Sequence, residues 1–329
     1  MTVVKRDQSD TNGAMPVIVS AVPGARDLAQ VFSERHAEYE ASLSYGGALL
    51  FRGFDVFDVA AFERAMDALS AQRMTYLYRS TPRTAVGAGV FTSTEYPPEQ
   101  AIPLHNENAF QRRWPLKVAF CCLLRARVGG ETPIASVRRV TDRIPAAIVD
   151  QFEARRIKYV RHYRPHVDLP WQTVFQVDTR DGVAEFCARH DIEHEWLDDE
   201  TLRTAQVCQG TAHHPITGER LWFNQAPLFH ASSLGAADAR SLTACFGADR
   251  LPRHCYYGDG GELSADDLRV VREAFEAETV VFRWETGDVL LLDNMLVAHG
   301  RRPFKGDRKI VAALLDPSSP DTDGPTHGS

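Results

Sequence analysis

The chain has 329 residues, of which 44% are hydrophobic and 25% charged, and its formal net charge is −7. This composition is ordinary for a globular protein, and the length is ample for burying a core in one large domain or two. The acidic balance and the scattered arginines argue against a general nucleic-acid binder, and no apolar stretch approaches the length of a membrane span.

The cysteines and the first fourteen residues predict a cytoplasmic protein. Residues 1–14 are polar and charged and lack the apolar segment of a signal peptide. The six cysteines show no C-x-x-C spacing, so we expect reduced, mostly buried thiols rather than a zinc site. Residues 1–16 are expected to be disordered, as is the tail 317–329, which is rich in Pro, Asp, Gly and Ser.

The first half of the chain alternates short strands with helices. Residues 46–54 predict a strand with a turn at each end, and residues 56–72 predict a helix because their apolar side chains recur at helical spacing. Residues 74–104 mix turn formers with short β-prone pieces. A strand, a glycine turn, a second short strand and a helix are then predicted at 117–124, 129–130, 131–136 and 146–156.

The middle of the chain, about residues 160–265, differs in character. It is rich in His, Trp, Arg and Pro, and its strands are expected to be short or absent, with helices at 183–190 and 264–278. β structure resumes at three segments, 279–284, 289–298 and 309–315. The simplest account is an insertion between two halves of one β core, inside a single domain that spans residues 17–316.

Two short motifs carry the chemistry. In Leu104-His105-Asn106-Glu107, an imidazole and a carboxylate stand two residues apart, so in a strand both can reach one ion while Asn106 points away. His299 can supply a third ligand, because it ends the apolar run 289–298, which predicts a buried strand and turn. Two imidazoles and one carboxylate hold a mononuclear non-haem Fe(II) on one face and leave the other open.

Each motif has a plainer interpretation when taken alone. A His-x-Glu tripeptide is common by chance, and a lone His after an apolar strand is more often a hydrogen-bonded core residue. The surrounding segments therefore decide between the two interpretations. These are Phe91-Thr92-Ser93-Thr94-Glu95-Tyr96-Pro97-Pro98, Ile102 to Glu107, Gly129-Gly130-Glu131-Thr132-Pro133-Ile134-Ala135, Leu221-Trp222-Phe223-Asn224-Gln225-Ala226, Cys255-Tyr256-Tyr257-Gly258-Asp259-Gly260, and Gly287 to Asn294 running into His299.

In order and content, these segments resemble the Fe(II)/2-oxoglutarate-dependent oxygenases of the taurine dioxygenase and clavaminate synthase-like superfamily. The chain looks most like the syringomycin-biosynthesis-protein-like branch, which is found in natural-product gene clusters. The resemblance covers roughly residues 45–316. It implies a mainly β protein with flanking helices (α+β), with a double-stranded β-helix, or jelly roll, as its core and the insertion as a lid over the active site. It implies Fe(II) and 2-oxoglutarate as cofactors and His105, Glu107 and His299 as the iron ligands.

The resemblance also implies that Thr132 and Arg308 bind the distal carboxylate of 2-oxoglutarate. The chemistry supports Arg308, because a carboxylate favours a fixed, charged, two-pronged donor. Arg301 and Arg302 are rivals, and Lys309 is a weaker one. The plainer alternatives are a solvated turn for Arg301 and Arg302 and an ordinary strand threonine for Thr132.

Substrate contacts are less well defined by the sequence. Candidates lie beside the metal motif and in the insertion, and for each the alternative is structural packing: Asn106, Asn108, Arg164, Trp171, Asn224, Gln225 and His230. The adjacent pair His213-His214 is interpreted as part of a loop. Neighbouring residues of a strand point to opposite faces, so both could not serve one metal.

The acidic ligand narrows the reaction. Related halogenases carry a small residue at the position of Glu107, so this chain is expected to hydroxylate, desaturate or epoxidise. The leading hypothesis is hydroxylation of an unactivated carbon of an amino acid or an amino-acid-derived intermediate in natural-product biosynthesis, with 2-oxoglutarate decarboxylated to succinate and CO2. Its partners would be O2 and a small-molecule substrate, either free or tethered to a carrier protein of a peptide synthetase.

Two alternatives remain open. A catabolic oxygenase of the taurine-dioxygenase type, acting on a small anion, predicts basic residues aimed at the metal, and the sequence shows no clear cluster of them. A jelly-roll binding protein without redox turnover is the third hypothesis, and the intact ligand set together with Arg308 argues against it.

Overall fold

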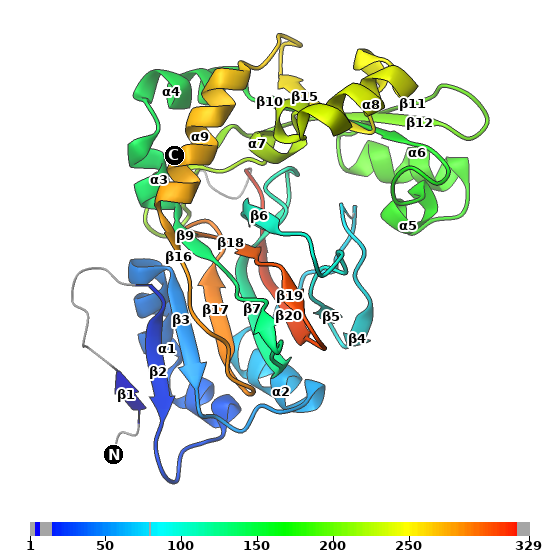
Figure 1. Cartoon of the computed structure of the whole chain (residues 1–329). Coiled ribbons are helices and arrows are strands. Elements are labelled where there is room, and N and C mark those ends of the chain that lie inside the picture. The colour runs from blue at the N-terminus through cyan, green and yellow to red at the C-terminus, as the bar shows by residue number, and fades with distance from the viewer. Residues whose placement is uncertain (1–3, 7–14, 79, 321–329) are drawn as a thin grey trace, which may run out of the picture.

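The computed structural model describes residues 4–6, 15–78 and 80–320 (Figure 1). The segments predicted to be disordered, 1–16 and 317–329, lie mostly outside these residues. Of their described parts, Val4–Arg6 (β1) pairs antiparallel with Val17–Ala21 (β2), and the last strand, Lys309–Ser318 (β20), continues to Ser318. The domain limits 17 and 316 therefore stay a prediction.

A large sheet and a small sheet form the body of the molecule. The large sheet has eight strands in the order β1-β2-β3-β17-β7-β20-β5-β4, and the small one has four in the order β16-β9-β18-β6. The remaining strands of the large sheet are Ala48–Arg52 (β3), Val289–Asp293 (β17), Trp114–Leu124 (β7), Val90–Thr92 (β5) and Ala85–Gly87 (β4). Those of the small sheet are Thr279–Val280 (β16), Ile134–Ser136 (β9), Val297–Arg301 (β18) and Ile102–His105 (β6). Apart from the parallel β2–β3 pair, the strands of both sheets pair antiparallel.

The central strands of the large sheet are buried on both faces, which is why they read as unbroken apolar runs. Alternate residues enter two different cores, since successive side chains of a strand point to opposite sides. Leu290 and Leu292 of β17 join the core that includes the small sheet. Val289 and Leu291 join the core formed with the helices Leu28–Gly46 (α1) and Val59–Leu69 (α2). The large sheet is therefore sandwiched between the small sheet and two helices, and the α+β class is confirmed.

We expect Leu291→Ala to lower the free energy of unfolding by about 2–5 kcal/mol, because it leaves a cavity in the helix-facing core. Leu291 is fully buried between β3 and β7. Urea-induced unfolding measures the change. Ile216→Ala is the matched control, because Ile216 is 65% exposed and its truncation should shift stability by no more than about 0.5 kcal/mol. Equal effects of the two substitutions would contradict this account of the core.

The middle of the chain forms its own sheet, which corrects the expectation that strands there are short or absent. Its strands are Ile157–Tyr163 (β10), Glu193–Trp196 (β11), Leu202–Cys208 (β12) and Arg253–Tyr257 (β15), in the order β11-β12-β10-β15. β10 and β12 are seven residues long. These strands were not predicted because their sequences mix polar and aromatic residues, and polar side chains such as Arg161 and Thr204 are buried beside apolar ones.

Helices surround this sheet. Those within the segment are Trp171–Phe175 (α5), Arg180–Arg189 (α6), Ala226–Phe229 (α7) and Ala236–Phe246 (α8), and a hairpin joins Thr211–His213 (β13) to Arg220–Trp222 (β14). Val137–Arg143 (α3), Ala146–Arg155 (α4) and Ala265–Ala277 (α9) flank it. Figure 1 shows the segment at the end of the molecule nearest β6, away from β1 and β2.

The helices predicted at 56–72, 146–156, 183–190 and 264–278 are confirmed as α2, α4, α6 and α9, with bounds shifted by a few residues. The strand predicted at 279–284 is confirmed only for Thr279–Val280. Helix α1 was not predicted, because its apolar spacing breaks at Arg35, whose backbone is non-helical. Among the described helices, none is both long and apolar enough to span a membrane.

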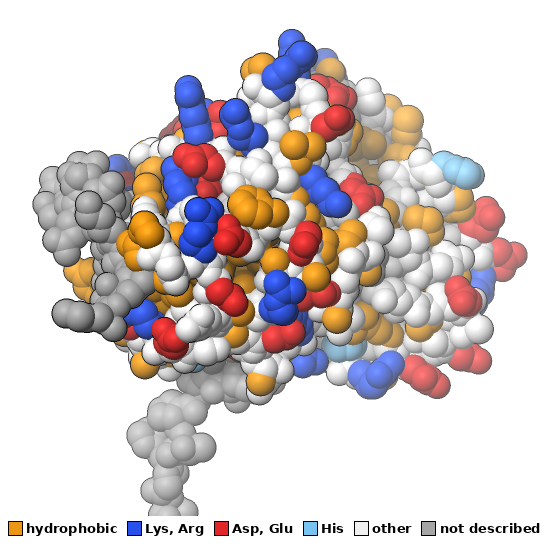
Figure 2. Space-filling model, turned by 90° about the horizontal axis from the view of Figure 1, so that it is seen from below, with side chains coloured by type: hydrophobic (Ala, Val, Ile, Leu, Met, Phe, Trp, Pro, Cys, Tyr) orange, Lys and Arg blue, Asp and Glu red, His pale blue; other side chains and the backbone are white. Residues whose placement is uncertain are grey.

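Five of the six cysteines are buried and Cys245 on α8 is exposed, and none of them is in a disulfide. Burial raises the pKa of the Cys122 and Cys187 thiols to about 12. On the face shown in Figure 2, acidic and basic side chains are interspersed. That face therefore offers no field of one sign to a polyanion.

Candidate active site

His105 and His299 are direct neighbours across two paired strands. His105 ends β6, His299 lies in β18, and the two residues are Cα partners in the antiparallel register. Their ring centroids are 4.6 Å apart. Glu107 follows in a turn just after β6 rather than within the strand, and its Oε2 lies 3.7 Å from Nε2 of His299. One donor atom from each of the three residues lies within 4.8 Å of the others.

The hydrogen bond of His105 leaves its Nε2 free to bind a metal. Its Nδ1 lies 2.9 Å from the carbonyl oxygen of Pro103, which can only accept, so Nδ1 carries the proton and Nε2 keeps its lone pair. Burial and the neighbouring His299 lower the pKa of His105 to about 4. The ring is therefore neutral near pH 7, as a metal ligand must be. Nδ1 of His299 is buried and has no hydrogen-bond partner among the described residues.

Glu107 is a buried carboxylate held in its charged form. Burial by itself would raise its pKa, but the charge of Arg83 is the largest of the effects that outweigh burial and hold the pKa below its usual range. Nη2 of Arg83 lies 2.7 Å from Oε2 of Glu107. The imidazoles of His105 and His299 and one ionised carboxylate converge here, and this donor set fits Fe(II).

A second cluster has similar composition but does not fit a metal. His230, His254 and Glu262 also place donor atoms within 4.8 Å of one another. However, Nδ1 of His230 accepts from the N–H of Ser232, and Nδ1 of His254 accepts from the N–H of Ala231. Each ring then carries its proton on Nε2, so neither has a free lone pair.

The two histidines of the triad share a pocket with the residues expected to bind 2-oxoglutarate. Its lining includes His105, His299, Thr132 and Arg308. Arg83 and Arg301 line the same pocket. The hydroxyl of Thr132 accepts from the indole N–H of Trp284 at 3.1 Å, which fixes the threonine side chain.

Arg308 is the arginine best placed to receive a carboxylate. Its Nε donates to the carbonyl oxygen of Gly130 at 3.0 Å, and its Nη1 lies 3.4 Å from the hydroxyl of Ser93. Burial and the charge of Arg301 lower the pKa of Arg308 to about 10, so it remains charged at neutral pH. In the described part of the chain no carboxylate lies within ion-pair distance of it, and Glu131 acts on its charge only from farther away.

Gly130 makes room for that arginine. Its φ is +76°, a backbone conformation that favours glycine, and a Cβ there would lie 3.1 Å from Cδ of Arg308. The predicted glycine turn thus has a function in shaping the pocket.

The rival cations are placed differently. Arg301 donates to the carbonyl oxygens of Tyr96, Pro97 and Gln100, so its guanidinium is committed to the backbone. Arg302 and Lys309 are exposed. The geometry therefore favours Arg308 over all three.

Asn106 and Asn108, beside the triad, are both buried. The amide of Asn106 donates to the carbonyl oxygen of Asn294 at 2.5 Å, as expected for a side chain that points away from the ion. Neither amide atom of Asn108 has a hydrogen-bond partner among the described residues. Asn108 therefore has unused hydrogen-bonding capacity, whereas Asn106 serves the fold.

Asn224 and Gln225 line a second cavity, of about 330 Å³, that also reaches His105. Asn224 donates to the carbonyl oxygen of Gly210 at 2.6 Å, and Gln225 donates to that of Asn106 at 2.6 Å. These two side chains therefore tie the loop before α7 to the metal motif and also face a cavity.

The structure does not bring the other candidates to either pocket. Arg164 donates to the carbonyl oxygen of Arg250 and lies over the ring of Phe246. Trp171 packs edge-on against Trp196, and the His230 ring packs in a tilted arrangement against His254. These contacts lie within the middle segment.

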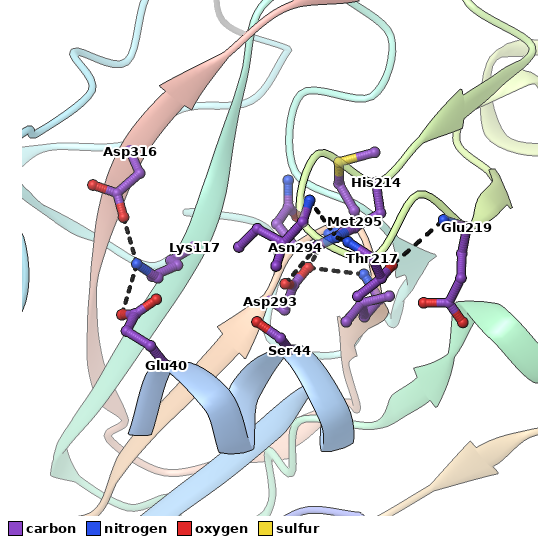
Figure 3. A network of polar contacts seen from close by, with 12 residues as sticks. Glu40, Ser44, Lys117, His214, Thr217, Glu219, Asp293, Asn294, Met295 and Asp316 are labelled. Carbon is purple, nitrogen blue, oxygen red and sulfur yellow. Dashed lines mark hydrogen bonds and ion pairs between the residues drawn. The ribbon is translucent and has the colours of Figure 1, made fainter. Parts of the chain in front are cut away.

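His213 ends β13, which corrects the expectation that His213 and His214 lie in a loop, but the two side chains diverge as expected. His213 is exposed, whereas His214 is buried and donates from Nε2 to Oδ2 of Asp293 at 2.9 Å. Figure 3 shows His214 and Asp293 pointing toward one another at the turn that leads from β17 to β18. Oδ1 of Asp293 accepts from the N–H groups of Met295 and Leu296, which fixes this turn.

Two residues at the site had no predicted role. Asn294 holds the backbone of Glu107 on both sides: its Oδ1 accepts from the Glu107 N–H at 2.7 Å, and its Nδ2 donates to the Glu107 carbonyl oxygen at 2.9 Å. Asn294 ends the segment Gly287 to Asn294, one of those that resemble the oxygenase family, and this was the one feature of the sequence that could have pointed to it. Arg83 lies in a loop far from any motif, and only its spatial position beside Glu107 identifies it.

Comparison with known proteins supports the chemistry of this site. Residues 19–314 match the family described as "Taurine catabolism dioxygenase TauD, TfdA family". Dapdiamide synthesis protein DdaC of Enterobacter agglomerans is 40% identical over 310 residues, which cover 94% of each chain. A clavaminate synthase-like protein of Arabidopsis thaliana is 31% identical over 287 residues, which cover 84% of this chain and 83% of that one.

The fold agrees with this. A crystal structure of asparagine oxygenase in complex with Fe(II), 2S,3S-3-hydroxyasparagine and succinate superimposes with a TM-score of 0.54 at 16% identity, covering 87% of this chain and 79% of that one. The mixed α+β arrangement of sheets thus matches the jelly-roll structures of the family. The chain belongs to the TauD/TfdA family and is an Fe(II)/2-oxoglutarate-dependent dioxygenase.

Proposed function

We propose that this dioxygenase hydroxylates an unactivated carbon of an amino acid or an amino-acid-derived intermediate in natural-product biosynthesis. In this proposal His105, Glu107 and His299 hold the iron, and Thr132 and Arg308 hold the distal carboxylate of 2-oxoglutarate. The observation that carries it is that both histidines of the triad, Thr132 and the guanidinium of Arg308 line one pocket.

When bound, Fe(II) and 2-oxoglutarate supply the oxidising power: they activate O2 and oxidise a C–H bond while 2-oxoglutarate becomes succinate and CO2. The protein supplies position and protection from water. His105 keeps its proton on Nδ1, toward Pro103, throughout the reaction. Phe120 packs edge-on against His299 at 4.9 Å and shields that side of the site from solvent. No side chain is required as a general base.

The cavity that reaches His105 supports an amino-acid substrate. Its lining is largely apolar, including Ile102, Leu228 and Phe275, and its charged residues are Arg301, Arg302 and, on α9, Arg272 and Glu276. These last two stand one helical turn apart on α9 and carry opposite charges. A carboxylate and an ammonium on one substrate would match such a pair, with Asn224 and Gln225 as further polar contacts.

The relatives support the same substrate class. DdaC is described as a dapdiamide synthesis protein, and the superimposed asparagine oxygenase holds a hydroxylated amino acid. The alternative is a catabolic oxygenase of the taurine-dioxygenase type with a small anionic substrate. Arg83 beside Glu107 is the observation in its favour, because it places a cation next to the triad.

We further propose that the segment of about 160–265 is a lid. Gln225 and Asn224 connect this segment to the metal motif and face the cavity beside His105. A lid that opens there would admit a substrate tethered to a carrier protein of a peptide synthetase as well as a free amino acid.

The test begins with the anaerobic protein, Fe(II) and 2-oxoglutarate. We expect a weak visible charge-transfer band, which is absent when either component is omitted. Succinate release is then screened with free amino acids, their carrier-bound forms and small sulfonates. Stimulation by amino acids in either form supports the proposal, whereas stimulation by sulfonates alone favours the catabolic alternative. The absence of any band would overturn the assignment of the site.

A further inference from the structure

A buried ion pair joins the proposed carboxylate ligand to Arg83. The Arg83 and Glu107 side chains are 3% and 4% exposed, and Nη2 of Arg83 lies 2.7 Å from Oε2 of Glu107. This Oε2 is also the carboxylate oxygen 3.7 Å from Nε2 of His299. The oxygen that faces His299 therefore has a second, charged partner.

Arg83 is itself fixed from several sides. The carbonyl oxygen of Pro82 accepts from the N–H of Glu95, and Thr84 exchanges backbone and side-chain hydrogen bonds with Thr92 at 2.8 and 2.9 Å. The guanidinium lies 4.5 Å from the centre of the Tyr76 ring. A donor held so firmly can hold its acceptor in place.

We infer that Arg83 is a positioning residue for the metal site, and this inference rests on the proposed function of Glu107 as a ligand. A carboxylate oxygen has two lone pairs, so Oε2 can bind the metal with one and accept from Arg83 with the other. The bond to Arg83 fixes the rotation of the carboxylate, so that Glu107 presents a single oxygen to the ion. Without it, the carboxylate is free to turn and bind through both oxygens or neither.

A purely electrostatic role for Arg83 predicts the opposite change in metal affinity, so the two roles can be told apart by experiment. Arg83 is a cation close to a cation site, so removing its charge relieves repulsion and should tighten metal binding. Removing a positioning partner instead weakens metal binding, by about 10–100-fold for groups that orient a ligand.

The experiment measures Mn(II) affinity by electron paramagnetic resonance titration of the full-length apo-protein. Arg83→Gln removes the charge and the fork, and Arg83→Lys keeps the charge but loses the planar two-pronged donor. Arg52→Gln is the matched control. Arg52 likewise holds a buried carboxylate, that of Asp288, with bonds of 3.0 and 2.7 Å, and neither residue belongs to the pocket.

We expect Arg83→Gln to weaken Mn(II) binding about 10–100-fold, Arg83→Lys to restore it only in part, and Arg52→Gln to leave it unchanged. The visible bands of Co(II) bound to the Arg83 variants should also change shape, because they report coordination number. Wild-type or tighter affinity in Arg83→Gln would overturn the inference. If that variant does not fold, Arg83→Lys decides alone, since a purely electrostatic role predicts wild-type affinity for it.

The same experiment distinguishes failure of the proposed function from failure of the inference about Arg83. If the wild-type protein itself does not bind Mn(II), Glu107 is not a ligand, and both the proposed function and the inference fall. If the wild type binds Mn(II) and the Arg83 variants bind it equally well, the inference falls while the proposed function stands.

Discussion

His299→Ala is expected to abolish iron binding and turnover. His299 is buried in β18, paired with His105 on one side and packed against Phe120 on the other, so no other donor can take its place. Two ligands remain. Replacing a residue that only orients a ligand lowers metal affinity about 10–100-fold, and losing a ligand itself should lower it further. Iron retained after desalting and succinate formation measure the two effects.

The control for this prediction is His213→Ala, because His213 is an exposed imidazole away from the triad. It should bind iron as the wild type does. Near-normal iron content in a folded His299→Ala protein would show that the triad is not the metal site.

Arg308→Ala is expected to weaken 2-oxoglutarate binding about a hundredfold or more while leaving iron affinity in place. Each hydrogen bond to a charged group contributes about 1.5–3 kcal/mol, so losing a two-pronged contact costs about 3 kcal/mol or more. That corresponds to about two powers of ten in affinity. Absorbance titration of 2-oxoglutarate into the anaerobic Fe(II) protein gives the dissociation constant.

Arg302→Ala is the matched control, because Arg302 is an exposed arginine six residues before Arg308. It should bind 2-oxoglutarate almost as the wild type does, and Arg308→Lys should fall between, because lysine is a point charge without a fork. A large effect of Arg302→Ala together with a small effect of Arg308→Ala would move the carboxylate site to Arg302.

The sequence predicted the centre of the molecule better than its periphery. His105 and Glu107 stand two residues apart, and His299 ends an apolar run that the structure confirms as β17, a turn and β18. Such runs can be recognised in a sequence because a strand that is buried on both faces contains few polar residues.

What the sequence did not reveal depends on long-range contacts. Arg83 has no local pattern, and its role follows only from its position beside Glu107. The sheet of the middle segment was missed because its strands bury polar side chains. Arg161, for example, lies over the rings of Tyr78 and Tyr163, a contact that no periodicity predicts.

The distribution of the thiols supplies a built-in reporter. Maleimides react with the thiolate, and the five buried cysteines are both shielded and, where burial raises their pKa, protonated. Cys245 on α8 is exposed, so the unaltered chain should take up one fluorophore, on the segment proposed to move. Its emission could then follow opening and closing during a single turnover, with no engineered residue in the protein.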